Sequence, residues 1–327
     1  MSVLAVDIGG TNLRTMVFDS SCYRGGTDYH GGSSPTPFQL HKLPRNPKGS
    51  LDISSVAAVL RQQIDICRAE PGAAQVEAVG VSIAGTVDRS RRVVVRAMNL
   101  GLDDVGLAEM LEHAAEVPVV LETDSFAAGL AEARLGSGRG YDPVLFLTIG
   151  TGVGHAVISA GEVLRGARSG ASVFGHICVE PNGVECYCGR RGCLCMYASG
   201  AGLAALAGSA GYEADGEAVG KASQRGEDWA REVIAQADMY LARALAAALS
   251  LMNPARVVIG GGAFAPDAER FARLQLGVTE RVHASVQPIE IVPGRFLGSA
   301  SLVGAGLVAE EAVVVSKRGD NAEQRHS

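Results

Sequence analysis

The chain has 327 residues, of which 47% are hydrophobic and 20% are charged, so it is long enough for two folded domains and too apolar to be disordered. Its net charge of −6 disfavours a general binder of nucleic acid or of anionic membranes. The sequence has neither the basic start of a signal peptide nor an uncharged apolar run as long as a membrane span. We therefore expect a cytoplasmic protein without a nucleic-acid or membrane partner.

The first predicted elements are two strands joined by a glycine-rich turn. Val3 to Val6 and Thr15 to Phe18 are apolar runs that predict strands. The turn between them contains Asp7, Gly9, Gly10, Thr11 and Asn12. Glycines at such a tip let the backbone approach a phosphate closely, and Asp7 is placed to hold Mg²⁺ through water. By itself the motif also fits a plain hairpin with a glycine turn.

Helix and strand patterns alternate in the next segment. A helix is predicted from about Ser54 to Glu70, and Val76 to Ile83 predicts a buried strand. A short strand from Arg91 to Arg96 leads to Asn99. Asn99 is either a turn former or a residue that donates hydrogen bonds to a substrate, and the residues alone favour the turn.

A second unit is expected from about Pro118. Val117 to Leu121 predicts a strand that leads through Thr123 to Asp124, and a helical pattern follows from Ser125 to Leu135. An aspartate at such a junction commonly caps the helix. It can also accept a proton from a substrate hydroxyl.

The strand–turn–strand pattern then recurs. Val144 to Ile149 runs into a turn with Thr151 and Gly152, and a strand from Ala156 to Ser159 follows. The later predicted elements are a helix from Ser199 to Ala207, a long helix from Glu227 to Met252, a strand from Arg256 to Ile259 that runs into Gly260, Gly261 and Gly262, a strand from Ile289 to Val292 and a helix of small residues from Ser299 to Glu311.

Five of the seven cysteines lie within 21 residues, in a segment that also contains a histidine. Three thiolates and one imidazole satisfy the tetrahedral preference of Zn²⁺ without leaving an open position. We therefore predict a structural zinc site with the ligands His176, Cys186, Cys188 and Cys193. Unrelated buried thiols or disulfides are the alternative, but Cys186 and Cys188 are too close for a relaxed bridge, and the clustering suits a reducing cytoplasm.

Two strand–turn–strand units, at residues 3–18 and 144–159, imply duplicated halves that face each other across a cleft. This α/β pattern resembles the actin-like, ribonuclease-H-like ATPase fold. With the His-Cys-Cys-Cys segment added, the chain resembles the ROK family (repressor, open reading frame, kinase), sugar kinases with a structural zinc. The domains expected are residues 1–117 with helix 299–314 packed back on them, residues 118–298 with the zinc site, and a flexible tail at 315–327.

The resemblance implies an ATP- and Mg²⁺-dependent kinase, and a homodimer. The residues that it assigns to the phosphates and Mg²⁺ are Asp7, Gly9, Gly10, Thr11, Asn12, Thr151 and Gly152, and Gly260 to Gly262 would border the adenosine. Asp124 matches the general base, which takes the proton of the acceptor hydroxyl during phosphoryl transfer. Asn99 and His176 match positions that contact the acceptor, and His176 would also bind zinc.

Several acceptor positions depart from the family pattern. Val173 and Cys195 stand where hexose kinases of the family carry glutamates that bind sugar hydroxyls, and Thr123 replaces an asparagine. A pocket without those carboxylates should bind glucose poorly. His155 and Cys195 could indicate a second metal or a reactive thiol, but we expect both to fill space.

Three interpretations follow from these departures. The first is a kinase for a modified sugar or a C7-cyclitol of the valiolone type, in secondary metabolism. The second is an ordinary hexose kinase of the glucokinase, allose kinase or N-acetylmannosamine kinase type. The third is a non-catalytic sugar sensor. We favour the first, because Val173 and Cys195 replace the two glutamates that bind sugar hydroxyls. The retained Asp7, Thr11 and Asp124 argue against the third, as does a start at the phosphate motif, where the family's repressors carry a DNA-binding segment.

Overall fold

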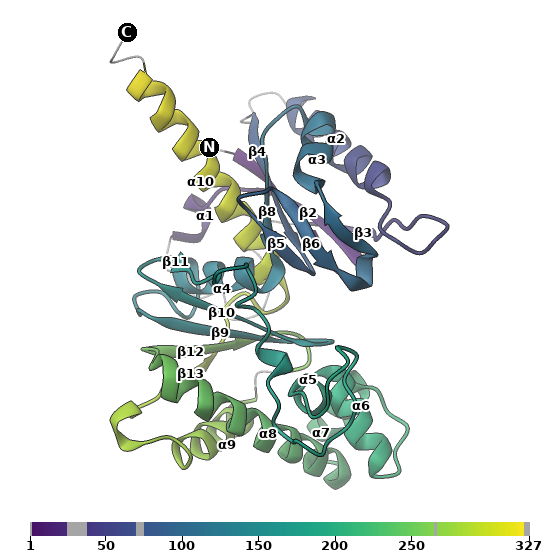
Figure 1. Cartoon of the computed structure of the whole chain (residues 1–327), viewed down its shortest axis with the longest axis vertical. Coiled ribbons are helices and arrows are strands. Elements are labelled where there is room, and N and C mark those ends of the chain that lie inside the picture. The colour runs from purple at the N-terminus through teal and green to yellow at the C-terminus, as the bar shows by residue number, and fades with distance from the viewer. Residues whose placement is uncertain (1, 25–37, 70–74, 265–266, 324–327) are drawn as a thin grey trace. The chain divides into compact units, whose positions relative to one another are not determined.

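The computed structural model describes residues 2–24, 38–69, 75–264 and 267–323, which fall into two units, each with its own sheet and core (Figure 1). Unit 1 consists of Met1–Ala131, Arg165–Gly170 and Ser299–Ser327. Unit 2 consists of Glu132–Leu164 and Ala171–Gly298. Unit 1 is therefore assembled from three separate parts of the chain.

The sheet of unit 1 has five strands in the order β3-β2-β1-β4-β8. Their bounds are β1 Ser2–Ile8, β2 Asn12–Phe18, β3 Gln39–Lys42, β4 Val76–Ile83 and β8 Val119–Thr123. β1 and β2 form the predicted antiparallel hairpin, while β1, β4 and β8 run parallel. Parallel strands end at the same edge of a sheet, so the ends of β1 and β8 bring their following residues to that edge.

Helices cover both faces of this sheet. Val79 and Val81 of β4 belong to a core that includes α2 (Ile53–Ala69) and α3 (Leu107–Ala115). Gly80 lies between them and faces α10 (Ala300–Glu323), because successive side chains of a strand point to opposite faces. A Cβ atom on Gly80 would lie 1.9 Å from the carbonyl oxygen of Ala305, so only glycine allows α10 to pack this closely.

The remaining elements of unit 1 are shorter. A three-stranded sheet has the order β5-β6-β7. Its strands and the other elements of the unit are β5 Thr86–Asp88, β6 Val93–Ala97, β7 Leu102–Val105, α1 Ser21–Arg24 and the 3₁₀ turn η1 Met98–Leu100. Helix α4 (Asp124–Leu135) begins in unit 1 and ends in unit 2.

The sheet of unit 2 repeats the topology of the first, with the order β11-β10-β9-β12-β13. Its strands are β9 Val144–Ile149, β10 Val153–Ser159, β11 Glu162–Val163, β12 Arg256–Gly260 and β13 Ile291–Pro293. As in unit 1, a hairpin stands beside parallel strands: β9 pairs antiparallel with β10 and parallel with β12. The duplicated strand–turn–strand pattern in the sequence is thus a duplicated sheet in the structure.

Two long helices pack together in unit 2. Figure 1 shows α8 (Asp228–Met252) and α9 (Ala268–Thr279) next to each other, and their apolar residues share one core with β9 and β12. The other elements are α5 Cys195–Ala198, α6 Gly200–Ser209, α7 Gly216–Gln224, and the 3₁₀ turns η2 Phe174–His176, η3 Ala284–Val286 and η4 Leu297–Ser299.

The domain limits of the structure differ from the predicted ones. The sequence predicted a division after residue 117, but β8 pairs with β4 in the first sheet, so unit 1 continues to Ala131. The predicted tail from residue 315 begins inside α10, which runs to Glu323, and residues 324–327 lie outside the described residues. Glu70, the predicted end of the first helix, is also outside them.

One helix is longer and more apolar than expected from the sequence, which predicted no uncharged apolar run as long as a membrane span. Leu297–Arg318 is long and apolar enough to span a membrane by length and composition alone. However, 61% of its most apolar window is buried inside the protein, and α10 packs on β1 and β4. Core helices of globular domains have the same composition, because they are apolar on all sides.

Candidate functional site

Asp7 is held by residues that strand register places opposite it. Arg14 of β2 and Ser82 of β4 are its register partners. The Arg14 guanidinium donates to Oδ2 of Asp7 from Nη2 at 2.6 Å and from Nε at 3.0 Å, and the Ser82 hydroxyl donates to Oδ1 at 2.5 Å. This buried carboxylate is therefore fixed in position, and its remaining lone pairs can still accept hydrogen bonds from water.

The glycine-rich turn after Asp7 presents an open backbone. The N–H of Gly9 donates to the carbonyl of Asn12 at 3.0 Å, which closes the turn, and Gly10, Thr11 and Asn12 are exposed. No atom lies within 4 Å of the position that a Cβ on Gly10 would take. The tip can therefore contact a ligand directly.

Arg45 joins this turn to the segment that carries Asn99. Its Nη2 donates to the carbonyl oxygen of Gly10 at 2.8 Å and to that of Asn99 at 3.1 Å. Asn99 lies in η1 and is exposed. The structure thus brings two predicted groups together, and it does so through an arginine that the sequence analysis did not identify.

Asp124 is the first residue of α4, directly after β8. The N–H of Ser125 donates to its Oδ1 at 2.6 Å, and part of the residue remains exposed. Burial of the carboxyl group, and then the negative charge of Asp7, raise the pKa of Asp124 to about 7. A carboxylate with this pKa can accept and release a proton near neutral pH.

The two residues before Asp124 have structural contacts. The hydroxyl of Thr123 accepts a hydrogen bond from the N–H of Val87 at 3.2 Å, which ties β8 to β5. Glu122 is 1% exposed and forms an ion pair with Arg165 at 2.5 Å. Of these three residues, Asp124 alone is partly exposed to solvent.

Unit 2 brings its two predicted glycine-rich turns together. Gly261 has a φ of +100°, and a Cβ atom there would lie 2.3 Å from the carbonyl oxygen of Ile149. The turn at Gly260 to Gly262 therefore packs against the start of the turn with Thr151 and Gly152, in a conformation that only glycine adopts without strain. A pocket of about 790 Å³ borders Gly262 and is also lined by α7, α8 and α9.

An arginine holds the end of that turn. Arg270 of α9 is 4% exposed and pairs with the buried carboxylate of Asp238 on α8 at 2.8 Å. Its guanidinium lies 3.9 Å from the centre of the Phe264 ring and donates to the carbonyl of Ala263 at 3.5 Å. These contacts anchor the residues that follow Gly262.

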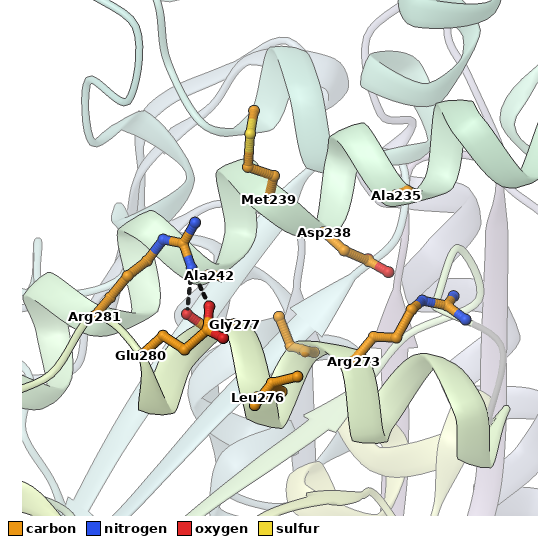
Figure 2. A pocket seen from close by; sticks show the side chains of 10 residues that line it. Ala235, Asp238, Met239, Ala242, Arg273, Leu276, Gly277, Glu280 and Arg281 are labelled. Atoms are coloured by element: carbon orange, nitrogen blue, oxygen red, sulfur yellow. Dashed lines mark hydrogen bonds and ion pairs between the residues drawn. The ribbon is translucent and has the colours of Figure 1, made fainter.

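A different pocket, of about 280 Å³, lies between α8 and α9 (Figure 2). Met239 and Leu276 lie on its walls, and Arg281 donates to the carbonyl of Gly277 at 2.6 Å. None of the predicted site residues lines this pocket. We therefore do not assign it to the candidate site.

The four predicted zinc ligands meet in unit 2. The donor atoms of His176, Cys186, Cys188 and Cys193 all lie within 4.8 Å of one another. Cys188 and Cys193 have their sulfurs 3.6 Å apart, and Cys186 Sγ lies 3.6 Å from His176 Nδ1. Ligands of a tetrahedral Zn²⁺ with Zn–S bonds of about 2.3 Å are separated by about 3.8 Å, so the donor set fits this ion.

The thiols of Cys193 and Cys195 disfavour negative charge unless a cation is present. Burial, and then contact with neighbouring thiols, raise the pKa of Cys193 to about 12. The same causes raise the pKa of Cys195 to about 12. A divalent cation at the centre would reverse this preference by stabilising thiolates.

Cys195 is buried and His155 is partly buried. Burial lowers the pKa of His155 to about 4, and its neutral ring accepts a hydrogen bond at Nδ1 from the N–H of Phe174 at 3.3 Å. Cys195 is 1% exposed, with its Sγ 3.6 Å from that of Cys186. Val173, in contrast, is exposed at the start of η2.

Comparisons with known proteins place these features in context. Residues 54–312 match the model of the ROK family. A glucokinase of Thermotoga maritima is 32% identical over 72% of this chain and 80% of its own length. A kanosamine kinase of Amycolatopsis mediterranei is 30% identical over 94% of this chain and 96% of its own length. The structure of a ROK family glucokinase from Streptomyces griseus, in complex with glucose and AMPPNP, superposes with a TM-score of 0.75 at 28% identity and covers 95% of this chain and 100% of its own.

Proposed function

Because the chain belongs to the ROK family and has the predicted actin-like ATPase fold, we propose that it is an ATP-dependent kinase that phosphorylates a hydroxyl group of a sugar or sugar-like acceptor. The observation that carries the proposal is Asp124, a carboxylate at the end of a parallel strand with a pKa of about 7. In this function Asp124 is the general base that takes the proton of the acceptor hydroxyl.

The donor site that we propose uses both glycine-rich turns. Asp7, Gly9, Gly10, Thr11 and Asn12 would hold phosphates and Mg²⁺, with Thr151 and Gly152 contributing from unit 2 and Gly260 to Gly262 bordering the adenosine. The open backbone at Gly10 and the fixed carboxylate of Asp7 support this assignment. Bound Mg²⁺ would neutralise the phosphate charge, and Asp7 would hold it through water, because both of its oxygens already accept hydrogen bonds from protein groups.

We propose that His176, Cys186, Cys188 and Cys193 hold a structural Zn²⁺. The donor spacing supports this assignment, and the four ligands leave no open position for catalysis. The zinc would fix η2 and thereby the imidazole of His176, which we place beside the acceptor. The five cysteines of this segment form no disulfide in the structure, which fits a reducing compartment.

For the acceptor we propose a modified sugar or a cyclitol. Val173 and Cys195 offer no carboxylate to sugar hydroxyls. One relative is named as a kinase of kanosamine, a sugar other than glucose. An ordinary hexose kinase is supported equally by the glucokinase relatives. Asn99 would contact the acceptor from unit 1, and we expect a homodimer in solution.

Measurement of ADP formation across a panel of acceptors tests the proposal. The panel contains glucose, N-acetylmannosamine, allose, fructose, kanosamine and valiolone, each with ATP and Mg²⁺. We expect turnover with at least one acceptor and a preference for a modified sugar or cyclitol over glucose. Efficient turnover of glucose would identify an ordinary hexose kinase. Absence of ADP formation with every acceptor would contradict kinase activity and favour a sugar sensor.

A further inference from the structure

Tyr187 stands between two predicted zinc ligands, yet its side chain is 63% exposed. Its ring meets the His176 imidazole edge-on, with the ring centres 5.3 Å apart and the planes at 80°. This T-shaped geometry is one of the preferred arrangements of two aromatic rings. The zinc segment therefore presents an aromatic side chain directly beside the histidine that we place at the acceptor.

The phenol group of Tyr187 also reaches a glycine-rich turn of the proposed site. Its hydroxyl oxygen lies 3.6 Å from the position that a Cβ on Gly152 would take. Next to the same imidazole, Cys195 Sγ lies 3.8 Å from His176 Nδ1. Tyr187 thus connects His176, a proposed acceptor position, with the turn that we assign to the phosphates, and these residues all belong to unit 2.

The hydrogen-bonding capacity around Tyr187 is small. A thiol is a weak donor and acceptor, and the Cys195 thiol is only 1% exposed, so it offers little to an acceptor. Val173, which is 56% exposed, offers only methyl groups. A sugar hydroxyl turned toward this surface would lose its hydrogen bonds to water and gain only weak ones from the protein. The C–H groups on one face of an acceptor would instead pack against the Tyr187 ring.

We propose that Tyr187 is a specificity-determining residue that forms an aromatic wall of the acceptor pocket beside His176 and Val173. The wall selects neutral acceptors that turn a C–H face or a deoxygenated carbon toward it, and it rejects acceptors that need a carboxylate partner there. This inference rests on the proposed kinase function. Glucose is expected to bind more weakly than an analogue that lacks a hydroxyl on that side.

The substitution Tyr187→Ala tests the wall, and Tyr187→Phe separates the ring from its hydroxyl. With the preferred acceptor, Tyr187→Ala should raise KM by about tenfold or more while kcat changes by less than about threefold, because the ring contributes binding that is equal in the ground and transition states. Tyr187→Phe should keep most of the affinity. Tyr212→Ala is the matched control, since Tyr212 is also an exposed tyrosine of unit 2 but stacks on Trp229.

Two further measurements separate a wall from a structural role. Zinc content should remain at about one ion per chain in both Tyr187 variants, whereas loss of zinc together with activity would show that Tyr187 only supports the metal segment. Cys195→Glu should shift the preference toward glucose by about tenfold relative to the deoxy analogues. An unchanged acceptor KM and unchanged ranking in all variants would overturn the proposal.

Calorimetric binding distinguishes failure of this inference from failure of the kinase proposal. If wild-type protein forms no ADP with any acceptor of the panel, the kinase function is wrong. The binding of the same acceptors to the wild type and to Tyr187→Ala then tests the role of Tyr187 separately. Loss of acceptor binding in the variant supports the aromatic wall. Equal binding, or no binding by the wild type, contradicts it.

Discussion

Asp124 illustrates how the surroundings of a carboxyl group set its pKa. An aspartate in water has a pKa near 4 and is a weak base, but burial and the charge of Asp7 raise the pKa of Asp124 to about 7. Asp124→Asn keeps the shape and the acceptor for the Ser125 N–H. We expect kcat to fall by about 10²- to 10⁴-fold in an ADP-release assay. Wild-type-like turnover in this variant would remove Asp124 from the mechanism.

The same substitution has a predicted effect on stability. The folded-state pKa of Asp124 is raised above its unfolded value, so folding favours the protonated form, and stability is lost as the pH rises toward about 7. The asparagine variant has no carboxyl group at this position, so its stability does not fall with pH for this reason. Above pH 7 its free energy of unfolding should exceed that of the wild type by ~1–3 kcal/mol, less than the full shift implies because Asp124 is partly exposed. Urea unfolding of both proteins at about pH 5 and about pH 8 checks whether the variant's advantage in free energy of unfolding grows as the pH rises.

The pH dependence of catalysis follows from the same pKa. A general base acts in its ionised form, so kcat/KM for the acceptor should rise about tenfold per pH unit below pH 7 and level off above it. The measurement is a profile of kcat/KM from about pH 5 to about pH 9 at saturating ATP. A flat profile across the acidic half would contradict the assignment of Asp124 as the base.

The sequence predicted the residues with distinctive chemistry more readily than the residues that support them. Asp7 and Asp124 follow apolar strands, and that position is visible in the sequence. Arg14 and Ser82 became partners of Asp7 only through the register of three strands, which a single sequence does not specify. Arg45 contacts Gly10 through a loop without periodicity, so no local pattern indicated it.

At the scale of elements, the segment that carries the four proposed zinc ligands has little regular structure. Residues between η2 and α5 form turns and isolated bridges, such as that between Cys178 and Cys193, and no helix or strand. Because no helix or strand holds these residues in place, a bound metal would provide much of the segment's folding free energy.

Cys188→Ser tests the metal against a matched thiol in the same segment. We expect the purified variant to lose its zinc and to unfold with a free energy lower by several kcal/mol, roughly the cost of a broken structural zinc site. Cys178→Ser is the control, because Cys178 is also exposed but does not belong to the four-ligand group. A stable wild-type protein without zinc would contradict the site.

The small-residue helix α10 provides a second prediction at this scale. A Cβ on Gly304 would lie 1.9 Å from the carbonyl oxygen of Ala127 in α4, so Gly304→Ala must displace one helix. We expect a loss of about 2 kcal/mol or more in the free energy of unfolding. Gly220→Ala, in α7, meets no atom within 4 Å and should stabilise the protein by up to about 1 kcal/mol through helix propensity. Equal effects of the two substitutions would show that the α10 contact tolerates a methyl group.

Helix prediction from the sequence depended on the strength of the apolar pattern. α2 and α8 have long apolar stripes and were predicted within a few residues of their observed ends. α7 buries only Val219 and Ala222 and contains Gly220, so its pattern was too weak to recognise. The position of β8 was predicted, but its partner strand was not, because pairing of parallel strands depends on contacts distant in sequence.

At the scale of the whole molecule, the same sheet topology occurs twice, once in each unit. Each sheet pairs a hairpin with parallel strands, and each hairpin turn is a proposed phosphate contact. The two units differ in how they are built. Unit 2 occupies one continuous range apart from Arg165–Gly170, whereas unit 1 needs the helix from the other end of the chain.

This difference predicts how fragments of the chain fold. Residues 2–131 lack α10, which covers one face of β1 and β4, so this fragment should expose an apolar sheet face and show no cooperative unfolding. Addition of residues 299–323 as a separate peptide should restore a cooperative transition, measured by circular dichroism during urea titration. Residues 132–298 with zinc should unfold cooperatively alone, because their sheet and its helices belong to the same range. Cooperative unfolding of the first fragment without the peptide would show that α10 is dispensable for unit 1.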